Sequence, residues 1–218
     1  MIGTGSVDHS LRVWDLDKKC ELHTLKGHSG ELTAVIVTPD GRMVVSASLD
    51  HTLKVWHLET GSVLHTLEGH SEAVRAVALT PNGRYAVSTS SDHTLRVWDL
   101  ENGRDLHTLE GHSSDVNAVA VTSDGRYAVS ASNDKTLMMW DLSSGRQLRT
   151  FNGHLSYVKA VVVTHDGRRA ISASSDGTLK VWDLKSRVEH HVLRGHSPVR
   201  QTCAGVIARR TKGHNRLH

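Results

Sequence analysis

The sequence predicts an all-β protein built from repeated four-stranded antiparallel sheets, and three observations support this. Its five tryptophans are spaced 42 residues apart, at Trp14, Trp56, Trp98, Trp140 and Trp182. Five Gly-His pairs keep the same spacing and begin at Gly27, Gly69, Gly111, Gly153 and Gly195. Short apolar runs between these landmarks alternate with turn sequences rich in Gly, Asn and Asp. A repeat held in strict register indicates that each copy supplies one structural unit.

Residues 69–110 illustrate the unit. The apolar run 74–80 predicts a strand that is buried on both faces, and Pro81-Asn82-Gly83 predicts a turn. Two further strands are expected over residues 85–90 and 94–100. Residues 105–109 are shorter and more polar, as is typical of an exposed edge strand. One such sheet cannot bury its own faces, so the sheets are expected to stack radially as the blades of a β-propeller.

The register divides the chain into one expected domain, residues 1–206, followed by a basic tail over residues 207–218. Full repeats are expected at 27–68, 69–110, 111–152 and 153–194. Residues 1–26 match only the second, third and fourth strands of a repeat, and residues 195–206 match a first strand. Together these two pieces predict a composite fifth blade that closes the ring. The alternative is that the chain is a piece of a longer array.

The combination of Gly-His, Ser-x-Ser-x-Asp and Trp-Asp resembles the WD-repeat (WD40) β-propeller family, although His57 replaces the aspartate after Trp56. The closely similar copies resemble bacterial tandem WD-repeat proteins. That resemblance implies a hydrogen-bonded tetrad in each blade, made by the Gly-His histidine, a second-strand serine, a turn aspartate and the third-strand tryptophan. The implied sets are His28, Ser46, Asp50 and Trp56; His70, Ser88, Asp92 and Trp98; His112, Ser130, Asp134 and Trp140; and His154, Ser172, Asp176 and Trp182. An indole N–H, a hydroxyl, an imidazole and a carboxylate can satisfy one another in such a chain.

Catalysis, metals and cofactors are not expected. Ser, His and Asp recur identically in every repeat, whereas a catalytic nucleophile needs one singular, exposed site. The 17 histidines mostly occupy repeated positions, which a radial arrangement would spread around a ring. No phosphate-binding glycine loop is present in the sequence. We therefore expect a non-enzymatic protein without a cofactor.

The bulk composition excludes several other classes. The net charge of +3 is small, so nucleic acid is not expected as a partner. Two cysteines without a Cys-x-x-Cys pair favour a reducing compartment, and a cytoplasmic location is expected. The N-terminus lacks the pattern of a signal peptide, and no apolar run is long enough to cross a membrane.

The positions that differ between repeats are the candidate binding residues. After the first apolar residue of each first strand, the repeats carry Thr33, Arg75, Asn117, Lys159 and Arg200. Leu49 and Tyr157 add apolar side chains on the same expected face, which carries the Gly-His loops. Arg and Tyr are enriched in binding hot spots.

We therefore expect a scaffold that binds a protein or peptide partner of acidic character. The first alternative is a sensor or ligand-binding repeat segment of a larger multidomain bacterial signalling or NTPase protein. The second is a propeller enzyme, a hydrolase or a lyase.

Overall fold

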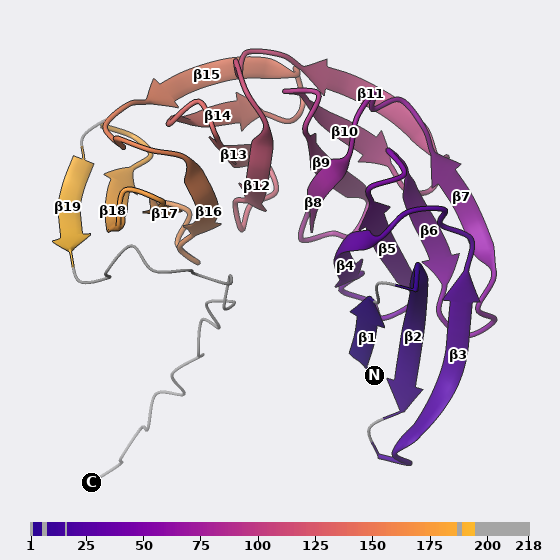
Figure 1. Cartoon of the computed structure of the whole chain (residues 1–218). Coiled ribbons are helices and arrows are strands. Elements are labelled where there is room, and N and C mark those ends of the chain that lie inside the picture. The colour runs from indigo at the N-terminus through magenta and orange to yellow at the C-terminus, as the bar shows by residue number, and fades with distance from the viewer. Residues whose placement is uncertain (1, 6–7, 16, 187–188, 195–218) are drawn as a thin grey trace, which may run out of the picture.

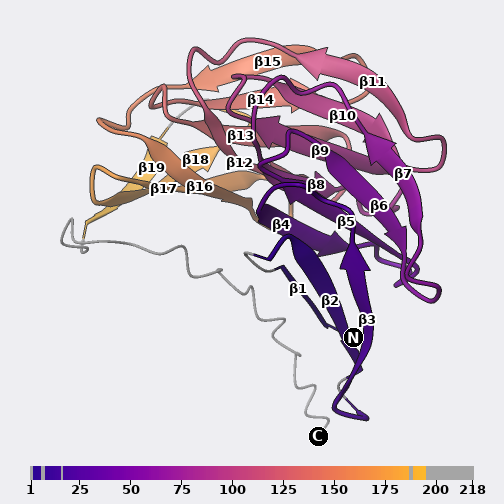
Figure 2. The same cartoon turned by 45° about the vertical axis from the view of Figure 1, so that its right-hand side comes forward.

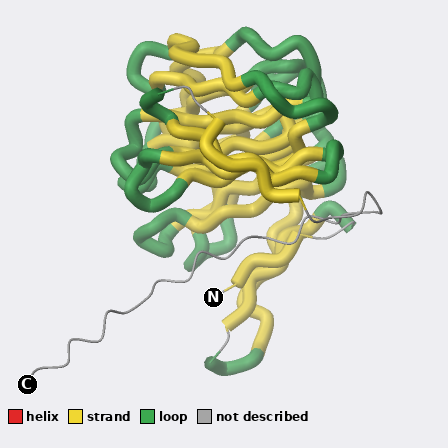
Figure 3. Tube along the Cα trace, turned by 90° about the vertical axis from the view of Figure 1, so that its left-hand side faces the viewer, coloured by secondary structure: helices red, strands yellow, loops and turns green. Residues whose placement is uncertain are grey.

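The computed structural model describes residues 2–5, 8–15, 17–186 and 189–194. These residues form nineteen strands, no helix, and five antiparallel sheets, which confirms the all-β fold class (Figure 3). The described residues accordingly contain no helix that could cross a membrane. The closing strand predicted at 195–206 and the tail at 207–218 lie outside the described residues.

Each sheet takes its strands from consecutive segments of the chain. The first sheet has three strands, β1 (Ile2–Gly5), β2 (Ser10–Asp15) and β3 (Cys20–Lys26). The second has β4 (Leu32–Val37), β5 (Met43–Ser48), β6 (Leu53–His57) and β7 (Val63–Leu67). The third has β8 (Val74–Leu79), β9 (Tyr85–Ser90), β10 (Leu95–Asp99) and β11 (Arg104–Leu109). The fourth has β12 (Val116–Val121), β13 (Tyr127–Ser132), β14 (Leu137–Asp141) and β15 (Arg146–Phe151). The fifth has β16 (Val158–Val163), β17 (Arg169–Ser174), β18 (Thr178–Asp183) and β19 (Glu189–Arg194).

The five sheets follow one another along an arc, with their first strands on the inner side and their last strands on the outer side (Figures 1 and 2). The inner strands β4, β8, β12 and β16 pack against their neighbours along the arc. The first sheet has no described strand at the position that β4 occupies in the second, so β1 is its inner edge. Several four-stranded sheets around one axis are the architecture of a propeller with about five blades.

The expectation that the first strand of each repeat is buried on both faces is wrong. In β8 only Val74 is fully buried, whereas five of the six residues of β9 are buried. The reason is position: the inner strand pairs with a neighbour on one side only and lies on the inner side of the arc. In the third sheet, β9 and β10 have a paired strand on each side, and the second and fourth sheets cover their two faces.

The hydrophobic core consists of the contacts between successive sheets. One face of the second sheet, with Leu53, Val55 and Leu67, packs against Trp98 and Leu100 of the third. The other three junctions use the equivalent residues. The four tryptophans at these junctions, Trp56, Trp98, Trp140 and Trp182, are only 1–2% exposed. The core therefore depends on each sheet having a neighbour.

A polar contact at the outer rim repeats at each junction. The His23 ring Nε2 lies 3.0 Å from the Glu59 carbonyl of the next sheet. His65 and His107 reach the carbonyls of Glu101 and Ser143 in the same way, at 3.2 Å. Arg149 replaces the histidine at the last junction and donates to the carbonyls of Leu184 and Lys185. The outer strands thus attach each sheet to the turn between the third and fourth strands of the next.

Thr89→Val is expected to raise the free energy of unfolding by about 1 kcal/mol. Thr89 is fully buried, and its hydroxyl has no hydrogen-bond partner among the described residues. Other repeats carry Ala47 and Ala131 at this position. Valine keeps the shape of the side chain and removes a desolvated polar group, and urea unfolding measures the change.

Thr80→Val is the matched control. The Thr80 hydroxyl is also buried, but it donates to Asn82 and accepts from the backbone N–H of Tyr85. This substitution is expected to lower stability by about 1–3 kcal/mol, because it leaves partners unsatisfied. Equal effects of the two substitutions would contradict the assignment of an unsatisfied hydroxyl to Thr89.

Candidate partner-binding face

In each four-stranded sheet two loops meet at one end of the strands, and together they make up what we call the loop face. The first loop contains the Gly-His pair and precedes the first strand; the second joins the second and third strands. In the second sheet the backbone N–H of Leu49 donates to the Glu31 carbonyl at 2.9 Å, and Ser91 with Ala73, Asn133 with Asp115 and Ser175 with Tyr157 repeat this bond. The variable residues of the two loops are therefore neighbours in every four-stranded sheet.

A buried side-chain network fastens the two loops together. In the second sheet the Trp56 indole Nε1 donates to the Ser46 hydroxyl at 2.8 Å, and that hydroxyl lies 2.8 Å from His28 Nε2. His28 Nδ1 lies 2.8 Å from Asp50, which also accepts from the backbone N–H of Ser29. The same contacts join His70, Ser88, Asp92 and Trp98; His112, Ser130, Asp134 and Trp140; and His154, Ser172, Asp176 and Trp182.

A fifth member of the network was not predicted from the sequence. The Thr52 backbone N–H and hydroxyl both donate to Asp50 Oδ1, at 3.0 and 2.7 Å. Thr94, Thr136 and Thr178 make the equivalent bonds. A threonine two residues after each turn aspartate is visible in the sequence as the Asp-x-Thr pattern, so the repeat itself contains this signal.

The network sets the protonation of its members. Burial lowers the pKa of His28 below 6.5, although the Asp50 carboxylate acts in the opposite direction. Burial raises the pKa of Asp50, but hydrogen bonds from Thr52, His28 and the backbone of Ser29 outweigh burial and lower it to about 2. The pKa values of Asp92, Asp134 and Asp176 are lowered in the same way. Each aspartate is therefore ionised at neutral pH, and it accepts hydrogen bonds from both loops, as Asp50 does from Ser29 and Thr52.

The residues predicted from the variable first-strand position lie at junctions between sheets. Thr33 donates to the Val74 carbonyl of the third sheet at 2.7 Å. Asn117 donates to the Val158 carbonyl of the fifth sheet at 2.8 Å, and also to Asn133 of its own sheet. Lys159 reaches back to Asn133 of the fourth sheet at 2.9 Å. These side chains lie on the loop face and bridge adjacent sheets, whereas Arg200 lies outside the described residues.

Arg75 bridges two sheets through its charge. Its Nε donates to the Ser91 hydroxyl at 2.7 Å, and its Nη2 lies 3.0 Å from the Asp115 carboxylate of the fourth sheet. His93 approaches the same carboxylate at 4.0 Å. The side chain remains 42% exposed. Arg75 is thus a half-exposed junction residue whose charge is already paired.

The loop face of the fifth sheet differs from the others. Leu155 is 82% exposed and occupies the position of Ser29, Ser71 and Ser113. Tyr157 is 50% exposed, and the Lys159 ammonium lies 4.9 Å from the centre of its ring. Leu155 was not predicted as a binding residue, although its departure from a repeated serine was the available signal.

The remaining candidate, Leu49, lies apart from the fifth-sheet residues. It is 39% exposed, in the loop of the second sheet between β5 and β6. The structure thus brings Asn117 and Lys159 together at Asn133, with the Tyr157 ring beside Lys159. It places Arg75, Thr33 and Leu49 at earlier sheets.

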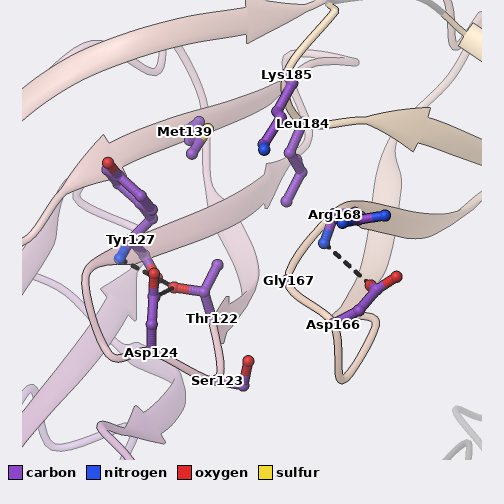
Figure 4. A pocket seen from close by; sticks show the side chains of 10 residues that line it. All are labelled: Thr122, Ser123, Asp124, Tyr127, Met139, Asp166, Gly167, Arg168, Leu184 and Lys185. Atoms are coloured by element: carbon purple, nitrogen blue, oxygen red, sulfur yellow. Dashed lines mark hydrogen bonds between the residues drawn. The ribbon is translucent and has the colours of Figure 1, made fainter.

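A small pocket of about 370 Å³ lies at the opposite end of the strands, between the fourth and fifth sheets (Figure 4). Ser123 stands there in place of a proline. Pro39 and Pro81 fill the equivalent space at earlier junctions and approach Gly83 and Gly125 of the next sheet closely. The pocket carboxylates of Asp124 and Asp166 already accept bonds within their own turns.

No group of three or more His, Cys, Asp or Glu side chains that could hold a metal ion occurs in the described part of the chain. The Ser, His and Asp of each network are largely buried, and they contact one another and the tryptophan.

The sheets follow one another radially, and each four-stranded sheet contains the same buried His–Ser–Asp–Trp network. These two features define a repeat protein of the β-propeller class. Comparison with protein families agrees: the profile of the family described as WD domain, G-beta repeat matches residues 19–57, 61–99, 103–141 and 145–183. These matches cover more than half of the chain, so the chain belongs to the WD-repeat family. Each match begins near the outer strand of one sheet and ends on the third strand of the next.

Among characterised proteins, the chain is similar to Ribosome assembly protein 4 of Saccharomyces cerevisiae, with 40% identity over 43 residues. The similarity covers 20% of this chain and 8% of that protein. It therefore extends over about one repeat. A WD-repeat array of this kind has the architecture of a protein-interaction scaffold, and the resemblance to bacterial tandem members stays a prediction.

Proposed function

We propose that the chain is a non-enzymatic scaffold that binds a protein or peptide partner on its loop face, centred on Leu155, Tyr157 and Lys159. The exposure of Leu155 and Tyr157 is the observation that carries the proposal. Exposed aromatic and apolar side chains on a rigid surface favour partner binding, because little conformational entropy is lost when they are covered. The network beneath supplies that rigidity.

The charge around this patch supports an acidic partner segment. In the fifth sheet, residues 153–159 span the Gly-His loop and the start of β16, and they include Lys159 and no acidic residue. Lys135 lies on the neighbouring loop of the fourth sheet. The equivalent loops of the second, third and fourth sheets carry Glu31, Glu72 and Asp115. An acidic segment would therefore be attracted to the fifth-sheet end of the face rather than to the other end.

Three further observations support the other parts of the proposal. The four network serines are at most 1% exposed, which argues against a nucleophile. Cys20 is exposed and not in a disulfide, which is compatible with the cytoplasmic location expected from the sequence. The similarity to a ribosome assembly protein extends over about one repeat, so it supports a scaffold role without specifying the assembly.

Leu155→Ser combined with Tyr157→Ala is expected to weaken partner binding by about tenfold or more, because both substitutions remove hot-spot area. Affinity capture with quantitative mass spectrometry first identifies proteins held by the wild type, and a titration then measures each affinity. Leu106→Ser is the matched control, since Leu106 is 42% exposed on the outer strand β11, away from the loop face. If the double variant and the Leu106→Ser control lose affinity for the partner equally, or if neither loses affinity, the result would argue against this site.

Lys159→Glu is expected to weaken binding of the same partner by about three- to tenfold at low salt and less at high salt. Arg75 is tested by exchanging the charges of its ion pair, because Arg75→Glu alone would place two carboxylates side by side, at positions 75 and 115. Arg75→Glu with Asp115→Arg restores the ion pair with its charges exchanged. If the swap recovers wild-type affinity, Arg75 acts through the junction; if it does not, Arg75 contacts the partner.

A further inference from the structure

Each junction between sheets is made of two unlike faces. The leading face, as we call it, carries two apolar residues of the third strand and one of the fourth, for example Leu53, Val55 and Leu67. The trailing face of the next sheet covers it with the third-strand tryptophan and the leucine that follows, for example Trp98 and Leu100. The same pairing of faces occurs at all four junctions.

No described residue of another sheet covers the leading face of the fifth sheet. Leu193 occupies the position of Leu25, Leu67, Leu109 and Phe151, which are 1–3% exposed, yet Leu193 is 57% exposed. Leu179 and Val181 are half-buried, whereas their equivalents Leu53 and Val55 are completely buried. These residues are apolar, like those of the covered leading faces. They therefore form a leading face that has no trailing face packed against it in the described residues.

The first sheet presents the missing half. Trp14 is half-buried, whereas the other four tryptophans are only 1–2% exposed. The first and fifth sheets lie at the two ends of the arc, where the ribbon of one does not meet that of the other (Figures 1 and 2). Within the residues that the structure describes, one leading face and one trailing face therefore lack a covering sheet, and their chemistry matches.

We propose that the leading face of the fifth sheet binds the trailing face of the first sheet of a second copy of this chain. Trp14 of the second copy would then cover Leu179, Val181 and Leu193, as Trp98 covers Leu53, Val55 and Leu67 within one molecule. A second copy is the occupant that the structure favours, because the only trailing face left uncovered in the described residues belongs to this same chain. Such a contact is head-to-tail, because it joins two unlike surfaces. The rotation between neighbouring copies decides whether they assemble into a closed ring or an open filament.

The experiment uses the full chain in analytical ultracentrifugation over a wide range of concentrations. Wild-type protein is expected to show a mass that rises with concentration to at least twice that of the monomer. Leu193→Asp blocks only the leading face, at a position that is already exposed, and Trp14→Asp blocks only the trailing face. Each variant alone is expected to remain monomeric.

The mixture of the two variants separates this proposal from others. The Leu193→Asp variant keeps an unaltered trailing face, and the Trp14→Asp variant keeps an unaltered leading face. An equimolar mixture is therefore expected to form a dimer and nothing larger. Dimer formation also shows that both variants are folded at the tested face. Leu106→Asp, away from both faces, is the control and is expected to assemble like the wild type.

Wild-type protein that stays monomeric at every concentration would overturn the proposal. That result would leave closure of the two faces within one molecule, or their coverage by further repeats. Variants that assemble alone, or a mixture that stays monomeric while wild type assembles, would also overturn it, because the contact would then involve other surfaces.

Discussion

Trp98→Ala is expected to lower the free energy of unfolding by about 3–5 kcal/mol. The indole is 1% exposed and lies in the junction between the second and third sheets, so its removal leaves a cavity lined by Leu67 and Val55. It also donates to the Ser88 hydroxyl at 2.8 Å, and that bond is lost. Urea unfolding followed by circular dichroism measures the total change.

Two further tryptophan variants separate the contributions. Trp98→Phe keeps much of the buried ring area and removes the donor, so a smaller loss, of about 1–3 kcal/mol, is expected. Trp14→Ala should cost clearly less than Trp98→Ala, because Trp14 is only half-buried. A wild-type unfolding midpoint for Trp98→Ala, or equal losses at Trp14 and Trp98, would contradict the roles assigned to the two junction faces.

Stability is expected to fall steeply between pH 4 and pH 2, and Asp50 should contribute about 2 kcal/mol of that fall. Its pKa is lowered from 3.8 to about 2 in the folded protein. The unfolded chain therefore binds the proton more readily, so the contribution is fully present above pH 4 and is lost as the pH falls towards 2. The pKa of His28 is lowered, so the unfolded chain also binds this proton more readily. Below pH 6.5 the protein therefore loses further stability as the pH falls.

Asp50→Asn tests this assignment. The variant should be less stable than wild type at neutral pH, and the difference should shrink by about 2 kcal/mol between pH 5 and pH 2, since wild type loses the ionised carboxylate over that range. Urea unfolding at several pH values measures both. Glu68→Gln, which removes one exposed carboxylate outside the network, is the matched control for the loss of a negative charge. A constant difference between Asp50→Asn and wild type would contradict the pKa assignment.

The strands and the networks could be predicted closely from the sequence. The strands expected at 85–90, 94–100 and 105–109 lie within about one residue of β9, β10 and β11. Each copy of the repeat places its chemistry at the same offsets, so the errors that affect a single short strand are averaged over several copies. The hydrogen-bonding capacity of Trp, Ser, His and Asp then restricts how four buried groups can be arranged.

The roles of the variable residues could not be predicted in the same way. Thr33, Arg75 and Asn117 have the pattern of surface positions, because a single repeat does not contain the carbonyl or carboxylate of the next sheet. Leu155 could not be found from the strand pattern, since it lies in the loop before the strand and the loop sets its exposure. The half-burial of β8 follows from its place at the inner edge, which its apolar composition does not reveal.

Each family repeat begins near the fourth strand of one sheet and ends on the third strand of the next, so the repeat and the sheet do not coincide. This has a consequence for how such chains can change length. A stretch that starts at an outer strand, such as residues 19–57, carries Leu25 together with the Trp56 against which it packs. Duplication of one 42-residue stretch in the gene would therefore add a sheet and its attachment in a single event, and deletion would remove both. Recombination between closely similar copies could then lengthen or shorten the array without a compensating mutation at any contact.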